Sequence, residues 1–165
     1  MQTLEIKKIN ENAQLPFYAN RGDAGMDICS AEEVFIKPGQ TIAVSTGLIV
    51  NLPEGYELQI RPRSGLSLKT RLRLPNSPGT IDSGYKDELK IFIHNASPDG
   101  YREDASYDLS VSDNPPGTYH IQIGDRIAQM VLAQVVQGKV LEVKEFTEES
   151  VANRGGGFGS SGIKL

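Results

Sequence analysis

The stretch that decides the fold is EVFIKPGQTIAVSTGLIV, residues 33–50, in which short runs rich in Val, Ile and Thr lie on both sides of the turn KPGQ. Val, Ile and Thr favour strands, whereas Pro and Gly favour turns. Five other runs share this character: TLEIKKI, YELQIRPR, ELKIFIH, TYHIQIGDRIAQMVLAQVV and KVLEVKEF. Many short strands separated by turns predict an all-β sandwich or a jelly-roll-like β-barrel.

Helical periodicity is nearly absent from the chain. The one short candidate is SGLSLKT, residues 64–70, in which Ser64 is placed to cap the first turn. The length of 165 residues suits one domain with a sizeable core, and the sequence shows no repeat or domain boundary. We therefore expect a single β domain with one short helix.

Composition and charge exclude several classes of protein. The chain is 38% hydrophobic and 23% charged, as in ordinary globular proteins. A net charge of −4 argues against a general nucleic-acid binder, although a few arginines can still form an anion pocket. The N-terminal residues lack a secretory signal, and no apolar stretch is long enough to span a bilayer. We expect no membrane association, and a location in the cytoplasm or, for a viral or phage protein, inside the host cell.

Cysteine and histidine give little sign of chemistry. Cys29 is the only cysteine, which favours a reducing compartment, and a free cysteine is usually a small buried hydrophobic residue. His94 and His120 have no carboxylate or cysteine at metal-ligand spacing. We interpret all three residues as structural.

Two stretches combine charges with turn formers in a way that suits a phosphorylated ligand. In IRPRSGLS, Arg61 and Arg63 precede a helix start, so arginine, backbone N–H groups and a hydroxyl can bind an anion. The alternative is a basic strand end followed by an ordinary capped turn. In GDAGMDICS, Asp23 and Asp27 could bind Mg²⁺, which bridges carboxylates and phosphates, or Asp27 could hold an arginine in an internal ion pair.

Two further candidates are weaker when taken alone. In NSPGTIDSGYKDELKIFI, Asp82 could orient a water molecule, or its carboxylate could simply belong to an Asp-Ser-Gly turn. Tyr85 could pack against a sugar. In GDRIAQMVLAQVV, Gln129 could donate to a phosphate or be an amide at a strand edge.

Two segments depart from the strand pattern. Residues 95–118 are polar and rich in turn formers, and loops of this length without structure are usually functional or disordered. The second segment is the tail, which contains NRGGGFGSSG at residues 153–162. Its G-x-G-x-x-G pattern requires a following helix to bind a nucleotide, and only three residues follow it.

The order of these motifs is more specific than any one of them. AGMDICS, RPRSGL, NSPGTIDSGYKDEL, GDRIAQMVL and RGGGFGSSG resemble, in order, the five motifs of the homotrimeric dUTPase family. The resemblance runs from about residue 13 to 162. It implies a β-clip barrel and Mg²⁺-assisted hydrolysis of dUTP to dUMP and pyrophosphate, which limits uracil incorporation into DNA and supplies dUMP for dTTP synthesis. It also implies a homotrimer whose active sites draw on all subunits.

The resemblance assigns roles to individual residues. Asp82 matches the carboxylate that activates the attacking water, and Asp27 matches a residue that supports the magnesium water shell. The residues that match phosphate-binding positions are Arg63, Ser64, Gly65 and Gln129. Those that match the uracil-reading hairpin are Asn76, Gly79, Thr80, Ile81 and Lys90. Tyr85 matches the aromatic residue that lies under deoxyribose and excludes a 2′-hydroxyl.

The tail matches the family's mobile C-terminal arm, which closes over a neighbouring subunit's site. Arg154 would bind the γ-phosphate and Phe158 would stack on uracil, while Gly159, Ser160 and Ser161 would donate to the phosphates. We therefore expect a β-barrel domain at 1–147 and an arm at 148–165. The segment 95–118 is longer than the corresponding segment in compact members of the family. We interpret it as a surface insertion that could bind a protein partner.

Some features depart from the family pattern. Asp87 stands where glycine often follows the tyrosine motif, and the spacing from Arg154 to Phe158 is short. The related dCTP deaminases need a glutamate where this chain has Phe92. A second alternative is a binding protein that kept the fold and lost the reaction, but this chain retains both Asp82 and the tail.

Overall fold

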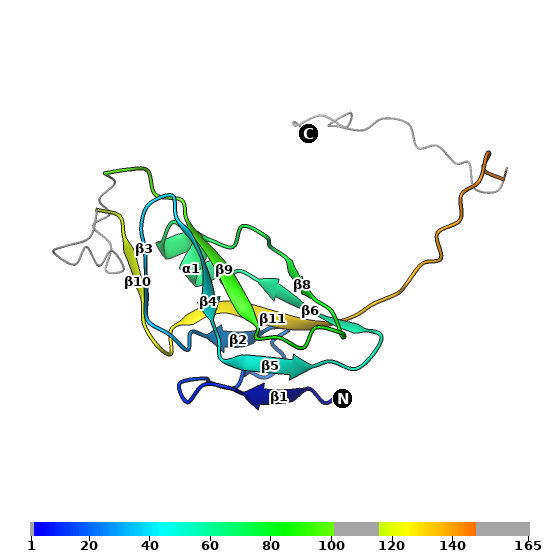
Figure 1. Ribbon diagram of the computed structural model, residues 1–165, viewed down its shortest axis with the longest axis horizontal. Coiled ribbons are helices and arrows are strands. Elements are labelled where there is room, and N and C mark those ends of the chain that lie inside the picture. Colours follow the sequence, from blue (N-terminus) through cyan, green and yellow to red (C-terminus); the bar gives the residue numbers. More distant parts are fainter. Residues whose placement is uncertain (1, 101–115, 148–165) are drawn as a thin grey trace.

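The computed structural model describes residues 2–100 and 116–147 (Figure 1). These residues form strands and one short helix, as the sequence predicts. The elements, in chain order, are β1 (Glu5–Lys8), β2 (Met26–Cys29), β3 (Val34–Ile36), β4 (Thr41–Ser45), β5 (Leu48–Asn51), β6 (Tyr56–Arg61), α1 (Ser64–Lys69), β7 (Leu72–Arg73), β8 (Gly79–Ile81), β9 (Lys90–Asn95), β10 (Tyr119–Ile121) and β11 (Arg126–Gln134).

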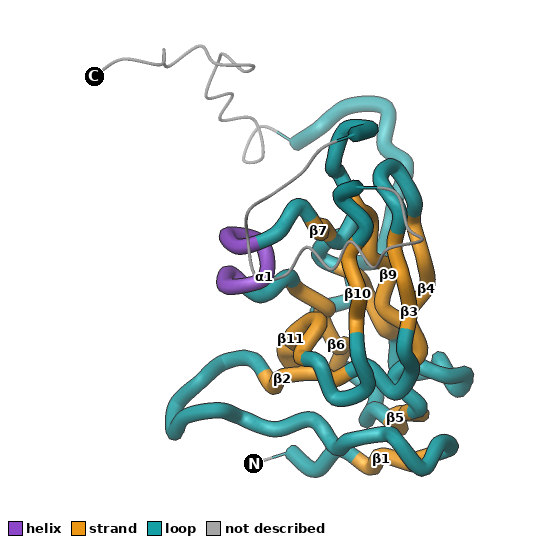
Figure 2. Tube along the Cα trace, turned by 90° about the vertical axis from the view of Figure 1, so that its left-hand side faces the viewer, coloured by secondary structure: helices purple, strands orange, loops and turns teal. Residues whose placement is uncertain are grey.

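The strands pair antiparallel in four sheets around one core. The largest sheet has the order β2-β11-β6-β8, and a second sheet has the order β4-β9-β7. The pairs β1-β5 and β10-β3 form the remaining sheets, and Figure 2 shows β3 beside β10 with α1 at the edge of the molecule. Apolar residues from all the larger sheets meet in this core, among them Ile28, Val44, Leu58, Ile91 and Met130.

The turn KPGQ transfers the chain from one sheet to another. Gln40 N donates to Lys37 O at 3.0 Å, and Gly39 has a φ of +73°, which a glycine adopts at low cost. β3 before the turn pairs with β10, whereas β4 after it pairs with β9. The turn predicted from the sequence is therefore confirmed, and it joins two sheets.

The connection between β4 and β5 is a tightly packed turn. Thr46 is fully buried and its hydroxyl donates to Leu89 O at 2.5 Å. Gly47 has a φ of +66°, and a Cβ there would lie 2.7 Å from Asn10 Cβ and 2.8 Å from Ala13 Cβ. Only glycine suits this position, so the turn is a rigid part of the fold.

The beginning of the helix differs from the sequence-based expectation. α1 begins at Ser64, and Arg63 occupies the N-cap position without a side-chain capping bond. Ser64 is therefore inside the first turn and does not cap it. The described residues contain no helix long and apolar enough to cross a membrane.

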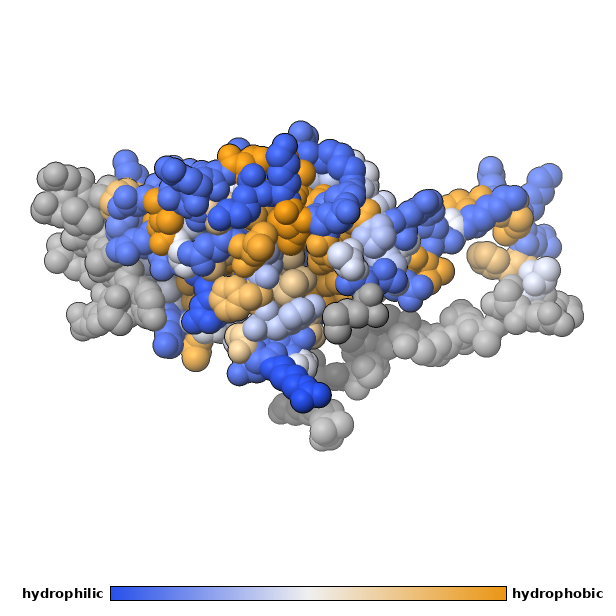
Figure 3. Space-filling view, turned by 90° about the horizontal axis from the view of Figure 1, so that it is seen from below, coloured by the Kyte–Doolittle hydropathy of each residue, from blue (hydrophilic) through white to orange (hydrophobic). Residues whose placement is uncertain are grey.

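The strand predicted at KVLEVKEF is wrong for this chain. β11 ends at Gln134, and residues 135–147 form no strand and run away from the sheets (Figure 1). Val140 is 96% exposed and Phe146 is 76% exposed. Figure 3 shows this segment extending from the body of the molecule with apolar side chains on its surface.

Candidate functional site

Five of the predicted phosphate and metal residues line one cavity. This arginine cavity, of about 450 Å³, lies where β2, β6, β11 and the start of α1 meet. Its polar lining comprises Asp23, Asp27, Arg61, Arg63, Ser64 and Gln129, together with the backbone of Gly25 and Gly65. The sequence separates these groups widely, and the pairing of β11 with both β2 and β6 brings them together.

Asp27 holds two arginines at the wall of the arginine cavity. Its carboxylate is 2.8 Å from Arg63 Nε through Oδ1 and 3.0 Å from Arg126 Nη1 through Oδ2. Asp27 is only 8% exposed, so the two guanidinium groups compensate a buried charge. The internal ion pair considered for Asp27 is therefore present, and it includes a second arginine that the sequence did not indicate.

Gln129 lies in the middle of the largest sheet. β11 pairs with β2 on one side and β6 on the other, so the alternative of an amide at a strand edge is wrong. Gln129 Nε2 donates to Pro62 O at 2.9 Å. A Cβ at Gly25 would lie 2.6 Å from Gln129 Oε1, so the glycine makes room for the amide against the cavity.

The residues predicted to read uracil form a second group. This hairpin cavity, of about 40 Å³, lies between β8 and β9. It is lined by Ile60, Leu74, Asn76, Gly79, Thr80, Ile81, Lys90, Ile91 and Phe92. All five predicted uracil residues are therefore adjacent to one another.

The two cavities open on opposite faces of the largest sheet. Arg61 lines the arginine cavity, whereas Ile60, the preceding residue on β6, lines the hairpin cavity. Neighbouring side chains on a strand project to opposite faces. One copy of the chain therefore presents the two groups of residues in different directions.

Asp82 and Tyr85 follow β8 and line neither cavity. The turn considered for Asp82 is present, since Tyr85 N donates to Asp82 O at 3.1 Å, but it uses the main chain. Within residues 2–100 and 116–147, the exposed Asp82 carboxylate has no hydrogen-bond partner. The side chain therefore remains available to a water molecule. The Tyr85 hydroxyl donates to Glu88 O at 2.9 Å.

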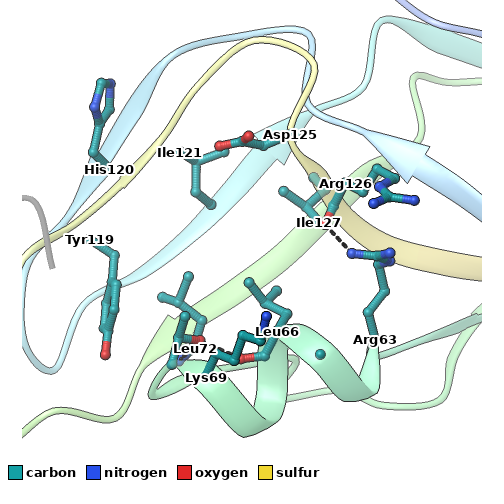
Figure 4. A pocket seen from close by; sticks show the side chains of 12 residues that line it. Arg63, Leu66, Lys69, Leu72, Tyr119, His120, Ile121, Asp125, Arg126 and Ile127 are labelled. Carbon is teal, nitrogen blue, oxygen red and sulfur yellow. Dashed lines mark hydrogen bonds between the residues drawn. The ribbon is translucent and has the colours of Figure 1, made fainter. Parts of the chain in front are cut away.

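A third cavity, of about 340 Å³, lies between α1 and the β10–β11 turn (Figure 4) and shares Arg63 and Gly65 with the arginine cavity. Arg63 contributes to both cavities and donates to Arg126 O at 3.3 Å. Several charged groups here already have partners: Asp27 binds both arginines, and Asp125 accepts from Gln122 N. Of the predicted phosphate and metal residues, Arg63 and Gly65 line this cavity, whereas Asp27, Ser64 and Gln129 line only the arginine cavity, which is therefore the better candidate for the site.

The side chains interpreted as structural have structural contacts. His94 Nδ1 is 3.0 Å from Thr41 Oγ1, and His120 Nε2 is 2.6 Å from Glu33 Oε1. Cys29 is free and buried, and burial, followed by the Asp27 charge, raises the pKa of its thiol. In the described part of the chain, no three His, Cys, Asp or Glu residues cluster as metal ligands.

Glu88 is a residue near the site that sequence reasoning missed. Its Oε1 accepts hydrogen bonds from Ser45 Oγ and, at 2.9 Å, from Gly47 N, and its Oε2 lies 3.6 Å from Lys90 Nζ. Burial by itself raises the pKa of Glu88. The hydrogen bonds and the Lys90 ammonium outweigh burial, so the pKa of Glu88 lies below its ordinary value. Its partners are distant in sequence, so no local motif could reveal this contact.

The lowered pKa of Glu88 predicts a pH dependence of stability. A carboxyl with a depressed pKa stabilises the fold above its unfolded pKa of about 4.3, and this contribution disappears as pH falls through the lower folded pKa. We expect the parent to have a higher free energy of unfolding than Glu88→Gln at pH 7 and this advantage to shrink below about pH 4. Urea denaturation of both proteins between pH 3 and 7 measures it. A difference that stays constant across this range would contradict the assignment.

The predicted arm residues, Arg154, Phe158, Gly159, Ser160 and Ser161, lie outside the described residues, as do residues 101–115 of the predicted insertion. Their roles remain predictions.

Comparison with known proteins identifies the family. The dUTPase family model matches residues 11–100. The chain is 44% identical over 162 residues to a deoxyuridine 5′-triphosphate nucleotidohydrolase from Hydrogenobaculum sp., covering 98% of this chain and 99% of the relative. It is also similar to the solved dUTPase of Staphylococcus bacteriophage 80alpha with dUPNHPP, with a TM-score of 0.87, 36% identity and coverage of 99% and 100%.

A second solved structure is that of a dUTPase variant from phage phi11 of S. aureus, described for its coordination of a structural Mg(II) ion. The TM-score is 0.78 at 35% identity, covering 88% of this chain and 99% of that one. These similarities extend over nearly the full length of the chain and agree with the order of its motifs. The chain belongs to the dUTPase family.

Proposed function

We propose that this protein hydrolyses dUTP to dUMP and pyrophosphate in a homotrimer with shared active sites. The observation that carries the proposal is the arginine cavity, where the residues predicted to bind phosphate lie together in a chain whose relatives are dUTP nucleotidohydrolases. The reaction would limit uracil incorporation into DNA and supply dUMP for dTTP synthesis.

Asp82 is the proposed catalytic residue. Its carboxylate accepts a proton from water while the water oxygen attacks the α-phosphorus. The bond from the α-phosphorus to the bridging oxygen breaks, and pyrophosphate leaves on the side opposite the water. The exposure of Asp82 and its lack of a partner among the described residues support this role, because both carboxylate oxygens are left to accept from the water.

The arginine cavity is the proposed triphosphate site. Arg63 supplies positive charge, Ser64 and Gly65 supply a hydroxyl and backbone N–H groups, and Gln129 supplies an amide donor. Arg63 is bound to Asp27, so turning its guanidinium toward phosphate would weaken that pair. Arg126 would then keep the buried carboxylate compensated, because it binds the other oxygen.

The hairpin cavity is the proposed uracil site. Asn76 and the main chain of Gly79, Thr80, Ile81 and Lys90 supply donors and acceptors at its walls. A cytosine in the same place would leave buried polar groups unpaired, and a thymine methyl would not fit. Tyr85 would lie under the deoxyribose and exclude a 2′-hydroxyl.

Mg²⁺ is the proposed cofactor. The carboxylates of Asp23 and Asp27 at the arginine cavity suit a cation that keeps most of its waters and takes other ligands from phosphates. Asp27 would bind it through water, since both carboxylate oxygens already accept from arginines. When bound, magnesium supplies neutralisation of the phosphate charge.

The geometry of one copy supports sharing of each site between subunits. The two cavities open on opposite faces, so a nucleotide that contacts both needs a second copy. The apolar side chains between 135 and 147 are exposed in one copy, and a neighbouring subunit would bury them. The arm at 148–165 would then close the site, with Arg154 on the γ-phosphate, Phe158 on uracil, and Gly159, Ser160 and Ser161 at the phosphates.

The remaining proposals rest on the sequence. We place residues 1–147 in the barrel domain and 95–118 in a surface insertion that offers a contact for a protein partner. The protein would act in the cytoplasm, or inside the host cell if it is encoded by a phage or virus, with no membrane or stable nucleic-acid binding.

Pyrophosphate release tests the proposed function. We expect release from dUTP with Mg²⁺, its loss with excess EDTA, and little release from dTTP, dCTP or UTP. Ammonia release from dCTP would indicate a deaminase instead. A purified protein that leaves dUTP intact would refute the proposal and favour a binding protein.

A further inference from the structure

We propose that Glu88 is a positioning residue that holds Tyr85 at the angle needed to exclude a ribonucleotide. The inference rests on the proposed function, because it takes Tyr85 as the residue that reads the sugar. A chain of contacts joins Tyr85 to the rigid β4–β5 turn through Glu88.

The first contact fixes the Tyr85 side chain. Its hydroxyl donates to the main-chain oxygen of Glu88 at 2.9 Å, although the residue is 39% exposed. An exposed aromatic ring in a loop samples several rotamers unless a bond restrains it. The position of the Glu88 carbonyl therefore sets the position of the Tyr85 ring.

The second set of contacts fixes Glu88 itself. Its carboxylate accepts from Ser45 Oγ at the end of β4 and from Gly47 N in the β4–β5 turn. Both main-chain polar groups of the next residue, Leu89, are hydrogen-bonded. Its N–H donates to Leu48 O at 2.8 Å, and its carbonyl accepts from the Thr46 hydroxyl at 2.5 Å. Glu88 therefore joins the exposed loop to a turn whose Thr46 is fully buried, as is Leu48 at the start of β5.

The turn can serve as a support because it has no freedom to adjust. A Cβ at Gly47 would overlap two neighbouring Cβ atoms, and the buried cluster of Ala13, Ala31 and Leu48 packs beneath it. A displacement of the Glu88 carboxylate would therefore be taken up by the loop that carries Tyr85, and not by the turn. A small movement of the ring would open space for a 2′-hydroxyl.

The test compares kcat/KM for dUTP with kcat/KM for UTP. We expect Glu88→Ala to lower this selectivity about tenfold, the effect of losing one well-placed contact. Glu88→Gln keeps an oxygen that accepts from Ser45 and Gly47, so it should keep most of the selectivity. Tyr85→Phe, which removes the hydroxyl, should resemble Glu88→Ala, and the double variant should lose no more than the larger single effect.

Glu33→Gln is the matched control, because its carboxylate binds His120 and does not contact the loop. A merely structural role would lower kcat/KM for both nucleotides by the same factor in Glu88→Ala, and that result would overturn the inference. Additive effects in the double variant would overturn it too. A parent that fails to hydrolyse dUTP refutes the proposed function, whereas selectivity unaffected by Glu88→Ala in an active enzyme refutes only this inference.

Discussion

Asp82→Asn is expected to lower kcat for dUTP hydrolysis about 10³-fold, within the usual range for a lost general base. Asparagine has nearly the same shape but accepts a proton poorly, so the water would no longer be activated. The Asp82 side chain makes no hydrogen bond within the described structure, so the free energy of unfolding should change little. Steady-state pyrophosphate release and urea denaturation measure the two quantities.

Asp87→Asn is the control for this variant, since it removes another exposed carboxylate from the same loop. It should retain activity close to that of the parent. If Asp82→Asn also stayed within a few-fold of the parent, the water-activating role would belong to another group.

Asp27→Asn is expected to affect both activity and stability. It removes the charge shared by Arg63 and Arg126, so Arg63 loses its orientation at the arginine cavity. Loss of such a supporting partner typically costs roughly 10- to 100-fold in activity or metal affinity. Because Arg63 is 25% and Arg126 48% exposed, we expect a stability loss of about 2 kcal/mol, less than for a fully buried pair.

Asp23→Asn distinguishes the loss of a carboxylate at the cavity from the loss of the arginine pair. Asp23 lines the same cavity, but its carboxylate accepts from Asn20 and holds no arginine. The rate of dUTP hydrolysis as a function of Mg²⁺ concentration, together with urea denaturation, distinguishes the effects of the two substitutions. Equal small effects of both substitutions would show that the arginine pair of Asp27 does not orient the site.

The sequence predicts the β architecture well because alternation and turn chemistry are local signals. These signals do not predict β2, because all four of its residues are buried and one of them is Asp27. Strands buried on both faces lose the alternation that reveals them. KVLEVKEF shows the opposite error: its alternation indicates a surface suited to burial, but no strand in the described part of the chain pairs with it.

The order of the motifs also predicts which candidate residues lie together. It does not predict which other residues form hydrogen bonds or ion pairs near the site. Arg126 and Glu88 look like ordinary charges in GDRIAQ and KDEL, yet they bind Asp27 and the β4–β5 turn. These contacts join residues far apart in the chain, and only the strand pairing brings them together. The division of the site into two faces is likewise invisible until the position of β6 in its sheet is known.

The most direct test of site sharing combines two inactive variants in one trimer. Asp82→Asn and Arg63→Ala chains, each with a different tag, are co-expressed and purified through both tags. If Arg63 and Asp82 of one site come from different copies, every mixed trimer has one site with both residues intact, so activity should return to about one third of the parental value. Activity no greater than that of the two separate variants would show that each chain forms its own site, and would contradict the account.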